Sequence, residues 1–313
     1  MQKQRSFREY LTLVGKGMMM GASDAVPGVS GGTIAFITGI YEELIFSLKQ
    51  CGPKALAILF KQGPKAAWAH VNGSFLLTLI AGILGSLLAF SHIILYWLAN
   101  YPEILWSFFF GLILASVWSV IQHVSHWNSN VLTAFAIGTI AAYVITSFTP
   151  ASIEATPIAF FLSGVLAICA MILPGISGSF ILLLLGMYNP ILTAITSLQI
   201  EILSIFALGC VIGLLSFSHV LSWMFSTYKT TTLALLGGFL LGSLNKVWPW
   251  KYTTAYTIDR HGEQVPLVQE NVLPTAFESL TGQPSYILYG IGAMLLGAIV
   301  VLFIQRMGSK DGV

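Results

Sequence analysis

Two near-copies of one short segment are the feature that most constrains this chain. Residues 27–45 read PGVSGGTIAFITGIYEELI, and residues 174–192 read PGISGSFILLLLGMYNPIL. Pro-Gly-x-Ser-Gly breaks a helix, and both copies lie within apolar sequence. In hydrocarbon every freed backbone N–H and C=O group needs a partner, so a break is tolerated only against protein or a polar cavity. Two breaks in an internal repeat therefore indicate a transporter-like binding site near the membrane midplane.

The composition restricts the class of protein. The chain is 56% hydrophobic and only 8% charged, whereas a soluble domain carries about 25% charged residues. Several apolar stretches reach the ~17–25 residues that span a bilayer, so we expect an all-α polytopic membrane protein. The three cysteines form no metal-binding cluster, and the basic residues are too few and too scattered for nucleic acid. We therefore expect no cofactor, no metal and no nucleic-acid partner.

The expected spans fall into two repeats with the same order, a broken hairpin followed by three spans. The first repeat, 1–150, has its hairpin at about 7–48 and its spans at about 74–98, 103–123 and 131–149. The second repeat, 151–313, has its hairpin at about 157–197, its spans at about 201–225, 231–248 and 285–305, and a long loop at 249–284. Alternation at 251–258 and 265–269 predicts a β-hairpin within that loop.

A second region of similarity supports the duplication, and the basic residues predict its orientation. Phe90-Ser91-His92 matches Phe217-Ser218-His219.

The N-terminal arm and the loop at 49–73 are both basic, so these segments and both termini should be cytoplasmic, with the loop at 249–284 outside. Each repeat then crosses an odd number of times, so the two copies are inverted. The hairpins either re-enter, leaving six full spans, or cross completely, giving ten.

The residues that follow each break can bind an anion. Such a turn before an apolar helix presents free backbone N–H groups at the positive end of the helix dipole. Glycines let an anion approach the backbone, and hydroxyl groups add donors. The candidate phosphate-binding residues are Ser30, Gly31, Gly32 and Thr33 in the first copy, and Ser177, Gly178 and Ser179 in the second. The alternative is a packing turn in which the glycines only permit close approach between helices.

Three charged residues near the first break are further candidates. Lys16 would either neutralise a bound phosphate or extend to the cytoplasmic surface. Asp24 would either carry a coupling ion or cap the turn. Glu42 would either serve in coupling or face the cytoplasm at a helix end. The coupling ion that these carboxylates suggest is H⁺ or Na⁺.

Two segments carry a resemblance to a known family. DAVPGVSGGTIAFITGIYEEL (24–44) and LPGISGSFILLLLGMYNP (173–190) resemble the signature segments of bacterial polyprenyl-phosphate translocases, long catalogued as a domain of unknown function. The resemblance covers essentially the whole chain. It implies that undecaprenyl phosphate, the lipid carrier of cell-wall precursors, is returned from the outer to the cytoplasmic leaflet of the cytoplasmic membrane. The implied partners are this lipid and the membrane lipids, and a homo-oligomer is left open.

Two rival functions are weighed against this one. A membrane phosphatase of undecaprenyl pyrophosphate also has inverted repeats and a Pro-Gly-x-Ser motif, but an arginine follows its serine. Here those positions are Gly31 and Gly178. We count only Lys16 as an intramembrane cation, and phosphoryl transfer depends on cations, so we expect no enzyme. A transporter of a small soluble anion remains open, because the sequence does not separate it from a lipid transporter.

Overall fold

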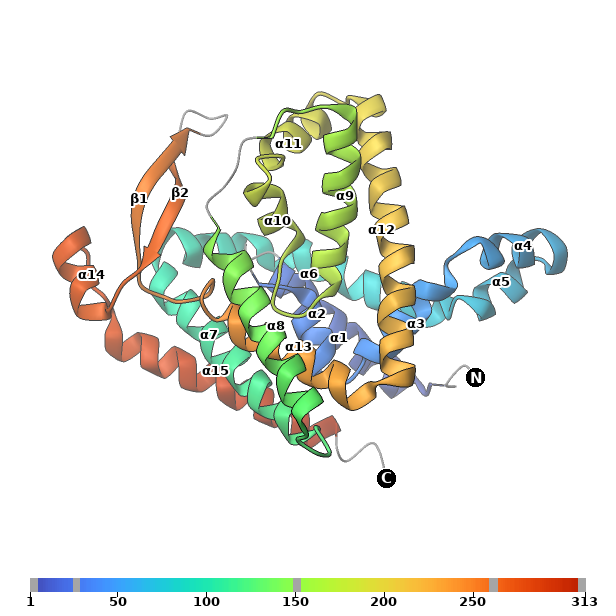
Figure 1. Cartoon of the computed structure of the whole chain (residues 1–313), viewed down its shortest axis with the longest axis horizontal. Coiled ribbons are helices and arrows are strands. Elements are labelled where there is room, and N and C mark those ends of the chain that lie inside the picture. Colours follow the sequence, from blue (N-terminus) through green and yellow to red (C-terminus); the bar gives the residue numbers. More distant parts are fainter. Residues whose placement is uncertain (1–4, 25–28, 149–152, 259–263, 309–313) are drawn as a thin grey trace.

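The computed structural model describes residues 5–24, 29–148, 153–258 and 264–308. Its first half contains α1 (Phe7–Asp24), α2 (Gly31–Ile37), α3 (Tyr41–Gln50), α4 (Pro53–Gln62), α5 (Pro64–His70), α6 (Gly73–Asn100), α7 (Pro102–Gln122) and α8 (Ser129–Ser147). Its second half contains α9 (Pro157–Ile172), α10 (Gly178–Leu184), α11 (Tyr188–Thr196), α12 (Ile200–Thr227), α13 (Lys229–Ser243), α14 (Pro274–Thr281) and α15 (Ile287–Gly308). The helical membrane architecture expected from the composition is confirmed (Figure 1).

One antiparallel β-hairpin interrupts the helical fold. Strand β1 (Lys251–Ile258) pairs with β2 (Gln264–Asn271), and Thr253 lies opposite Gln269. The hairpin predicted from alternation at 251–258 and 265–269 is therefore confirmed. It projects beside α14, away from the long helices (Figure 1).

Five of the described helices are long and apolar enough to cross a membrane, namely α6, α7, α8, α12 and α15. The sixth expected span, 231–248, is shorter than predicted because α13 ends at Ser243. Beyond Ser243, backbone carbonyls accept hydrogen bonds from side chains. Asn271 donates to the carbonyl of Asn245, and Lys251 donates to the carbonyl of Lys246. At 1.5 Å per residue, the 15 residues of α13 extend only about 22 Å.

The second arm of each hairpin, expected as one helix, is two helices. In the first hairpin α2 and α3 are separated at Gly39, which has φ of +72°, and in the second α10 and α11 are separated at Gly186, with φ of +68°. These glycines occupy equivalent positions of the repeat, and only glycine adopts this left-handed backbone without cost. Helices α10 and α11 are bent by 111°. This arm therefore does not cross as a straight span.

Equivalent glycines make equivalent contacts in the two halves. Helix α1 packs on α6, and α9 packs on α12. Gly17 lies against the carbonyl of Leu79, and Gly164 lies against the carbonyl of Phe206. Gly17 and Gly164 are 147 residues apart, which is the offset between the two hairpins, and Leu79 and Phe206 are 127 residues apart, which is the offset between the two spans. A side chain at either glycine would collide with the partner helix, so both helix pairs require glycine.

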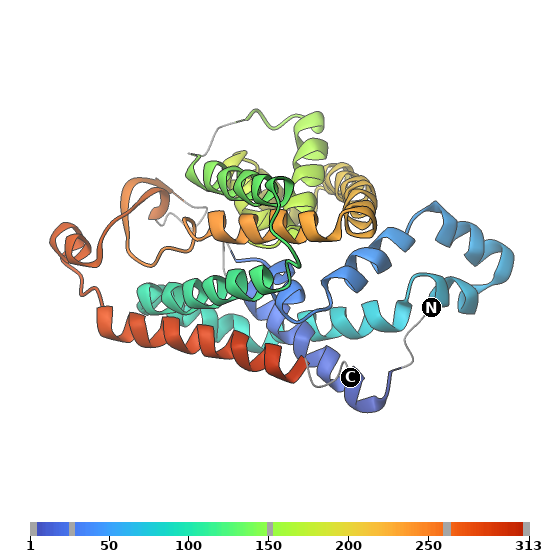
Figure 2. The same ribbon diagram turned by 60° about the horizontal axis from the view of Figure 1, so that its bottom comes forward.

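The remaining long helices pair between the halves. Helix α7 packs against α15, and α13 packs against α8, as the two views of the ribbon show (Figures 1 and 2). The carbonyl of Met294 meets Gly111, and the carbonyl of Phe135 meets Gly238. Helices α7 and α13 are equivalent in the repeat. Each of them packs against a helix of the opposite half, α7 against α15 and α13 against α8. The two halves are therefore bound into one unit.

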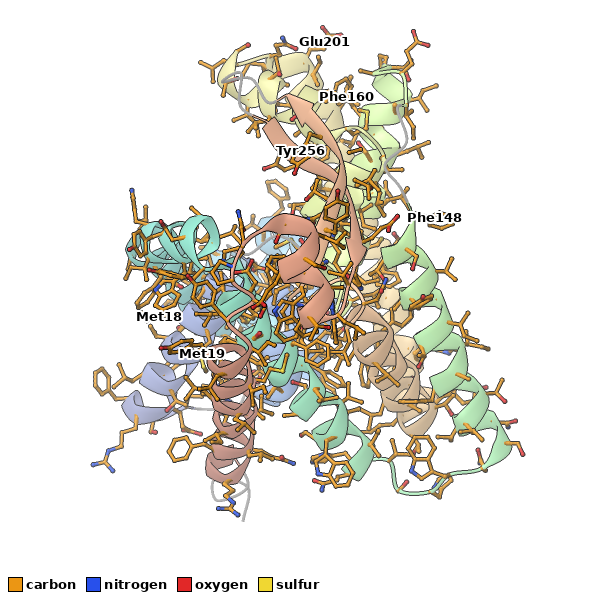
Figure 3. All side chains as sticks on the ribbon, turned by 90° about the vertical axis from the view of Figure 1, so that its left-hand side faces the viewer. Met18, Met19, Phe148, Phe160, Glu201 and Tyr256 are labelled. Carbon is orange, nitrogen blue, oxygen red and sulfur yellow. The ribbon has the colours of Figure 1, made fainter. Side chains whose placement is uncertain are left out.

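The outer faces of the long helices are apolar. On α8, the side chains of Leu132, Ile137 and Ile140 are each more than half exposed, at 59%, 56% and 62%. Figure 3 shows such side chains projecting outward along the helices, while the charged Glu201 lies at the far tip of α12. A surface of this kind is stable in lipid and not in water.

Candidate functional site

The two helix breaks meet. The hydroxyl of Thr33 accepts a hydrogen bond from the N–H of Gly175 at 2.9 Å. From the same side, Ser30 donates its hydroxyl to the carbonyl of Met171 at 3.2 Å, and Tyr41 donates its hydroxyl to the carbonyl of Ile172 at 3.0 Å. Side chains of the first motif thus satisfy the backbone that the second break frees, as a break within an apolar region requires.

The N–H groups of Gly31 and Gly32, at the start of α2, are already engaged. Ser30 is the N-cap of α2, and its hydroxyl accepts from the N–H of Gly32 at 3.1 Å. The N–H of Gly31 donates to the carboxylate of Asp24 at 2.7 Å. The anion position that the sequence predicts at this helix start is therefore occupied by a carboxylate of the protein itself. Pro27 and Gly28 lie outside the described residues.

The motif glycines also permit close packing. A Cβ atom on Gly31 would lie 2.6 Å from a carboxylate oxygen of Asp24, and one on Gly32 would lie 2.9 Å from the carbonyl oxygen of Ile172. A Cβ atom on Gly178 would lie 2.7 Å from the carbonyl oxygen of Ala167. Both interpretations of the motif are thus compatible with the geometry, because the same glycines bring the two breaks together and hold a carboxylate against the backbone.

The second break is less fully capped than the first. Ser177 occupies the N-cap position of α10 but makes no side-chain cap; its hydroxyl lies 2.8 Å from that of Ser179. Within the described parts of the chain, no acceptor is bonded to the N–H groups of Gly178 and Ser179. Among the described residues at the paired breaks, these two N–H groups of the second motif therefore remain able to bind an acceptor.

Two predicted residues lie away from the paired breaks. Lys16 donates to the carbonyl of Thr38 at 2.8 Å, at the carboxyl end of α2, where the helix dipole favours a cation. Glu42 forms an ion pair with Lys229 at 2.7 Å, and both side chains are about half exposed, at 50% and 59%. Of the three charged candidates, Asp24 is the one whose side chain bonds to the backbone at the start of α2.

Two lysines that the sequence analysis did not select follow α13, and one of them, Lys246, lies beside the second motif. The ammonium group of Lys246 lies 4.3 Å from the ring centroid of Phe180, in the first turn of α10. That of Lys251 lies 5.7 Å from the ring centroid of Trp106. Burial, together with the charge of Lys246, lowers the pKa of Lys251 to about 7. Lys246 falls within the predicted span 231–248, but in the structure it lies beyond Ser243, where α13 ends.

An apolar cavity adjoins the first hairpin. It has a volume of about 290 Å³ and lies between α1, α2, α6, α7 and α15. Its few polar side chains include Ser23 and Thr38, whose hydroxyl groups are bonded to helix carbonyls. The cavity therefore suits a hydrocarbon group and not a charged one.

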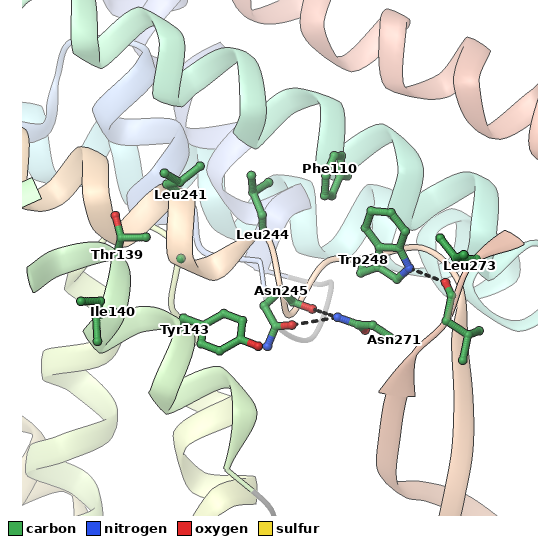
Figure 4. A pocket seen from close by; sticks show the side chains of 12 residues that line it. Phe110, Thr139, Ile140, Tyr143, Leu241, Leu244, Asn245, Trp248, Asn271 and Leu273 are labelled. Atoms are coloured by element: carbon green, nitrogen blue, oxygen red, sulfur yellow. Dashed lines mark hydrogen bonds between the residues drawn. The ribbon is translucent and has the colours of Figure 1, made fainter. Parts of the chain in front are cut away.

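A second cavity adjoins the end of α13. It has a volume of about 590 Å³ and lies between α7, α8, α13 and the segment that follows β2. Figure 4 shows its wall, where Asn271 donates to the side-chain and backbone oxygens of Asn245, each at 2.8 Å, and where Trp248 donates to a backbone carbonyl. These bonds fix the connection from α13 to β1, which carries Lys246.

The apolar helices and the paired breaks define a multi-pass helical membrane protein whose polar groups converge in its interior. A family model described as undecaprenyl phosphate translocase-like matches residues 20–265, and the chain belongs to this family. It is 49% identical over 301 residues to a polyprenyl-phosphate transporter of Vibrio cholerae, covering 96% of this chain and 98% of that protein.

A more distant relative agrees. The chain is 31% identical over 253 residues to a polyprenyl-phosphate transporter of Staphylococcus aureus, covering 75% of this chain and 84% of the relative. No solved structure matches the chain. The family model and the two relatives confirm the resemblance to polyprenyl-phosphate translocases.

Proposed function

We propose that this protein is a flippase that returns undecaprenyl phosphate from the outer to the cytoplasmic leaflet of the bacterial cytoplasmic membrane, for reuse in cell-wall precursor synthesis. The observation that carries the proposal is the hydrogen-bonded meeting of the two breaks, because it places polar backbone inside an apolar helical body. Both relatives are named as transporters of polyprenyl phosphate. The two repeats are inverted, the hairpins re-enter, and both termini are cytoplasmic.

The phosphate head is held at the paired breaks, and the polyprenyl chain beyond its first isoprene units stays in lipid. The motif hydroxyl groups and the uncapped start of α10 offer donors to the head. The cavity of about 290 Å³ beside the first hairpin gives the first isoprene units an apolar environment. The apolar lining of this cavity is compatible with a lipid substrate.

Asp24 links head-group binding to an ion. Its carboxylate lies on the N–H of Gly31, which is where a phosphate at the first break would bind. Two anions at one site repel each other, so protonation of Asp24, or Na⁺ bound beside it, favours the phosphate. Glu42 is the weaker candidate because it is half exposed and paired with Lys229.

A phosphatase is disfavoured by the chemistry of the site. No arginine is among the described residues that make the contacts between the two breaks, and the positions after the two serines are Gly31 and Gly178. Phosphoryl transfer relies on cations placed on the transferring group. The proposed reaction is therefore movement of an intact lipid.

Purified protein in vesicles tests this function. Polyprenyl phosphate is loaded in one leaflet, and leaflet distribution is followed together with released inorganic phosphate. The proposal expects exchange faster than in protein-free vesicles, without phosphate release. Exchange no faster than in protein-free vesicles, under imposed H⁺ and Na⁺ gradients, would overturn it, and phosphate release from the pyrophosphate form would indicate an enzyme.

A further inference from the structure

Two half-buried lysines, Lys246 and Lys251, lie close together after the end of α13. The ammonium group of Lys251 donates to the carbonyl of Lys246 at 2.5 Å. Within the described ranges, neither ammonium group lies within ion-pair distance of an acidic side chain. Glu103 is buried one turn before Trp106, yet it forms no ion pair with either lysine. Two like charges removed from water without a counter-charge destabilise the fold, and an anion bound beside them would relieve this destabilisation.

The pair is attached directly to the second motif. A Cβ atom on Gly175 would lie 2.7 Å from the hydroxyl oxygen of Ser243, at the end of α13. Three residues later, Lys246 donates its backbone N–H to the carbonyl of Ser243 at 2.9 Å and extends its ammonium group over the ring of Phe180. These two contacts place Lys246 beside the break that is less fully capped, and Lys251 is bonded to the carbonyl of Lys246.

We propose that Lys246 and Lys251 bind the phosphomonoester head of the transported lipid, in extension of the proposed function. A phosphomonoester carries a charge of about −1.5 to −2 at neutral pH, which is opposite in sign to the two ammonium groups and favours their protonated form. Lysine binds phosphate as a point charge. The two ammonium groups lie over the faces of Phe180 and Trp106, where cation–π contacts hold them. The same chemistry is shared by a lipid head group and by free inorganic phosphate.

Binding by the full-length protein in nanodiscs tests the assignment. The probes are a short-chain polyprenyl monophosphate, its parent alcohol and inorganic phosphate, each titrated by calorimetry. K246M and K251M are compared with K246R, which keeps the charge, and with K61M, which removes an exposed lysine of α4. Unfolding temperature and elution volume report whether each variant folds.

The assignment expects K246M and K251M to raise the Kd for the monophosphate at least about tenfold, which corresponds to ~1.4 kcal/mol. K246R and K61M should stay within about threefold of wild type, and the alcohol should bind all variants equally weakly. Equal monophosphate affinity in wild type and both methionine variants would overturn the assignment. So would equal losses in K246R and K246M.

Leaflet exchange on the same preparations separates this inference from the proposed function. Exchange by wild type with unchanged rates and affinities in K246M and K251M rejects the lysine site and keeps the transporter. Lysine-dependent binding of inorganic phosphate and of the monophosphate, without exchange by wild type, keeps the anion site and rejects the lipid transporter. Binding of inorganic phosphate alone would identify the soluble anion as the ligand and overturn the assignment to a lipid head.

Discussion

The hydroxyl oxygen of Thr33 accepts a hydrogen bond of 2.9 Å from the backbone N–H of Gly175. This bond joins two segments that are 142 residues apart in sequence, and both partners are buried. Each partner belongs to one copy of the repeated motif. Each copy of the motif therefore forms a local turn and also contacts the other copy. A change in its polar residues should affect both the stability of the fold and transport.

Removal of this acceptor should destabilise the protein. Thr33→Val keeps the shape of the side chain but leaves the N–H of Gly175 without a partner, at a cost of about 1–3 kcal/mol. Thermal unfolding in detergent measures the loss. Thr133→Val is the matched control, because the hydroxyl of Thr133 is exposed and bonds only within its own helix. Equal unfolding temperatures for the two variants would contradict the contact.

A methyl group at Gly32 should separate the two breaks. Its Cβ atom would meet the carbonyl oxygen of Ile172 at 2.9 Å, and overpacking of this kind costs about 1–3 kcal/mol. We expect Gly32→Ala to lower both the unfolding temperature and the rate of leaflet exchange. Gly15→Ala, in α1 with open space around it, should be neutral or stabilising by ~0.5–1 kcal/mol. The account does not survive if Gly32→Ala behaves like Gly15→Ala.

Stability should depend on pH through Lys251. Burial and the charge of Lys246 lower its pKa from 10.5 to about 7 in the folded protein. Between these two values the unfolded chain binds more protons than the folded chain, so the free energy of unfolding rises with pH across this window. Lys251→Met should flatten that rise between about pH 7 and 9, and Lys61→Met should not. The measurement is the unfolding midpoint at several pH values across this window. The same slope of midpoint against pH in Lys251→Met and wild type would refute the lowered pKa of Lys251.

Asp24 should govern the response to ion gradients. Asp24→Asn keeps an oxygen acceptor for the N–H of Gly31 but removes the titrating charge. We expect leaflet exchange by this variant to persist and to lose its response to an imposed H⁺ or Na⁺ gradient. Glu42→Gln is the comparison, because Glu42 lies in an ion pair away from the breaks. If both variants respond to the gradients as wild type does, neither carboxylate couples transport.

The sequence predicted the helical class, the β-hairpin and the two breaks, because these depend on composition, alternation and helix-breaking residues. It did not predict the division of each second hairpin arm, although Gly39 and Gly186 are identical in the two copies. An isolated glycine within an apolar helix is compatible with a continuous helix, and the positive φ at these positions is set by packing. The early end of α13 likewise depends on side chains far along the chain, such as that of Asn271.

The candidate site was predicted in part. The sequence identified the serines and glycines at each break and predicted free N–H groups there. It could not show which of these groups are bonded, because the contact between the two copies is a tertiary one. Lys246 was overlooked since it falls at the end of a predicted span, and Lys251 since it falls in a predicted loop. Their proximity arises from the turn after Ser243, which brings two residues five positions apart to one place.

Leaflet exchange by the paired-serine variant tests the central claim most directly. Vesicles with polyprenyl phosphate in one leaflet are prepared with wild type, with Ser30→Ala/Ser177→Ala, and with Ser204→Ala/Ser216→Ala, whose hydroxyl groups are exposed on α12 and bond within that helix. The account predicts that the paired-break variant exchanges lipid about tenfold more slowly or worse, equivalent to ~1.4 kcal/mol, while the control matches wild type. Exchange at the wild-type rate by a folded Ser30→Ala/Ser177→Ala protein would contradict it.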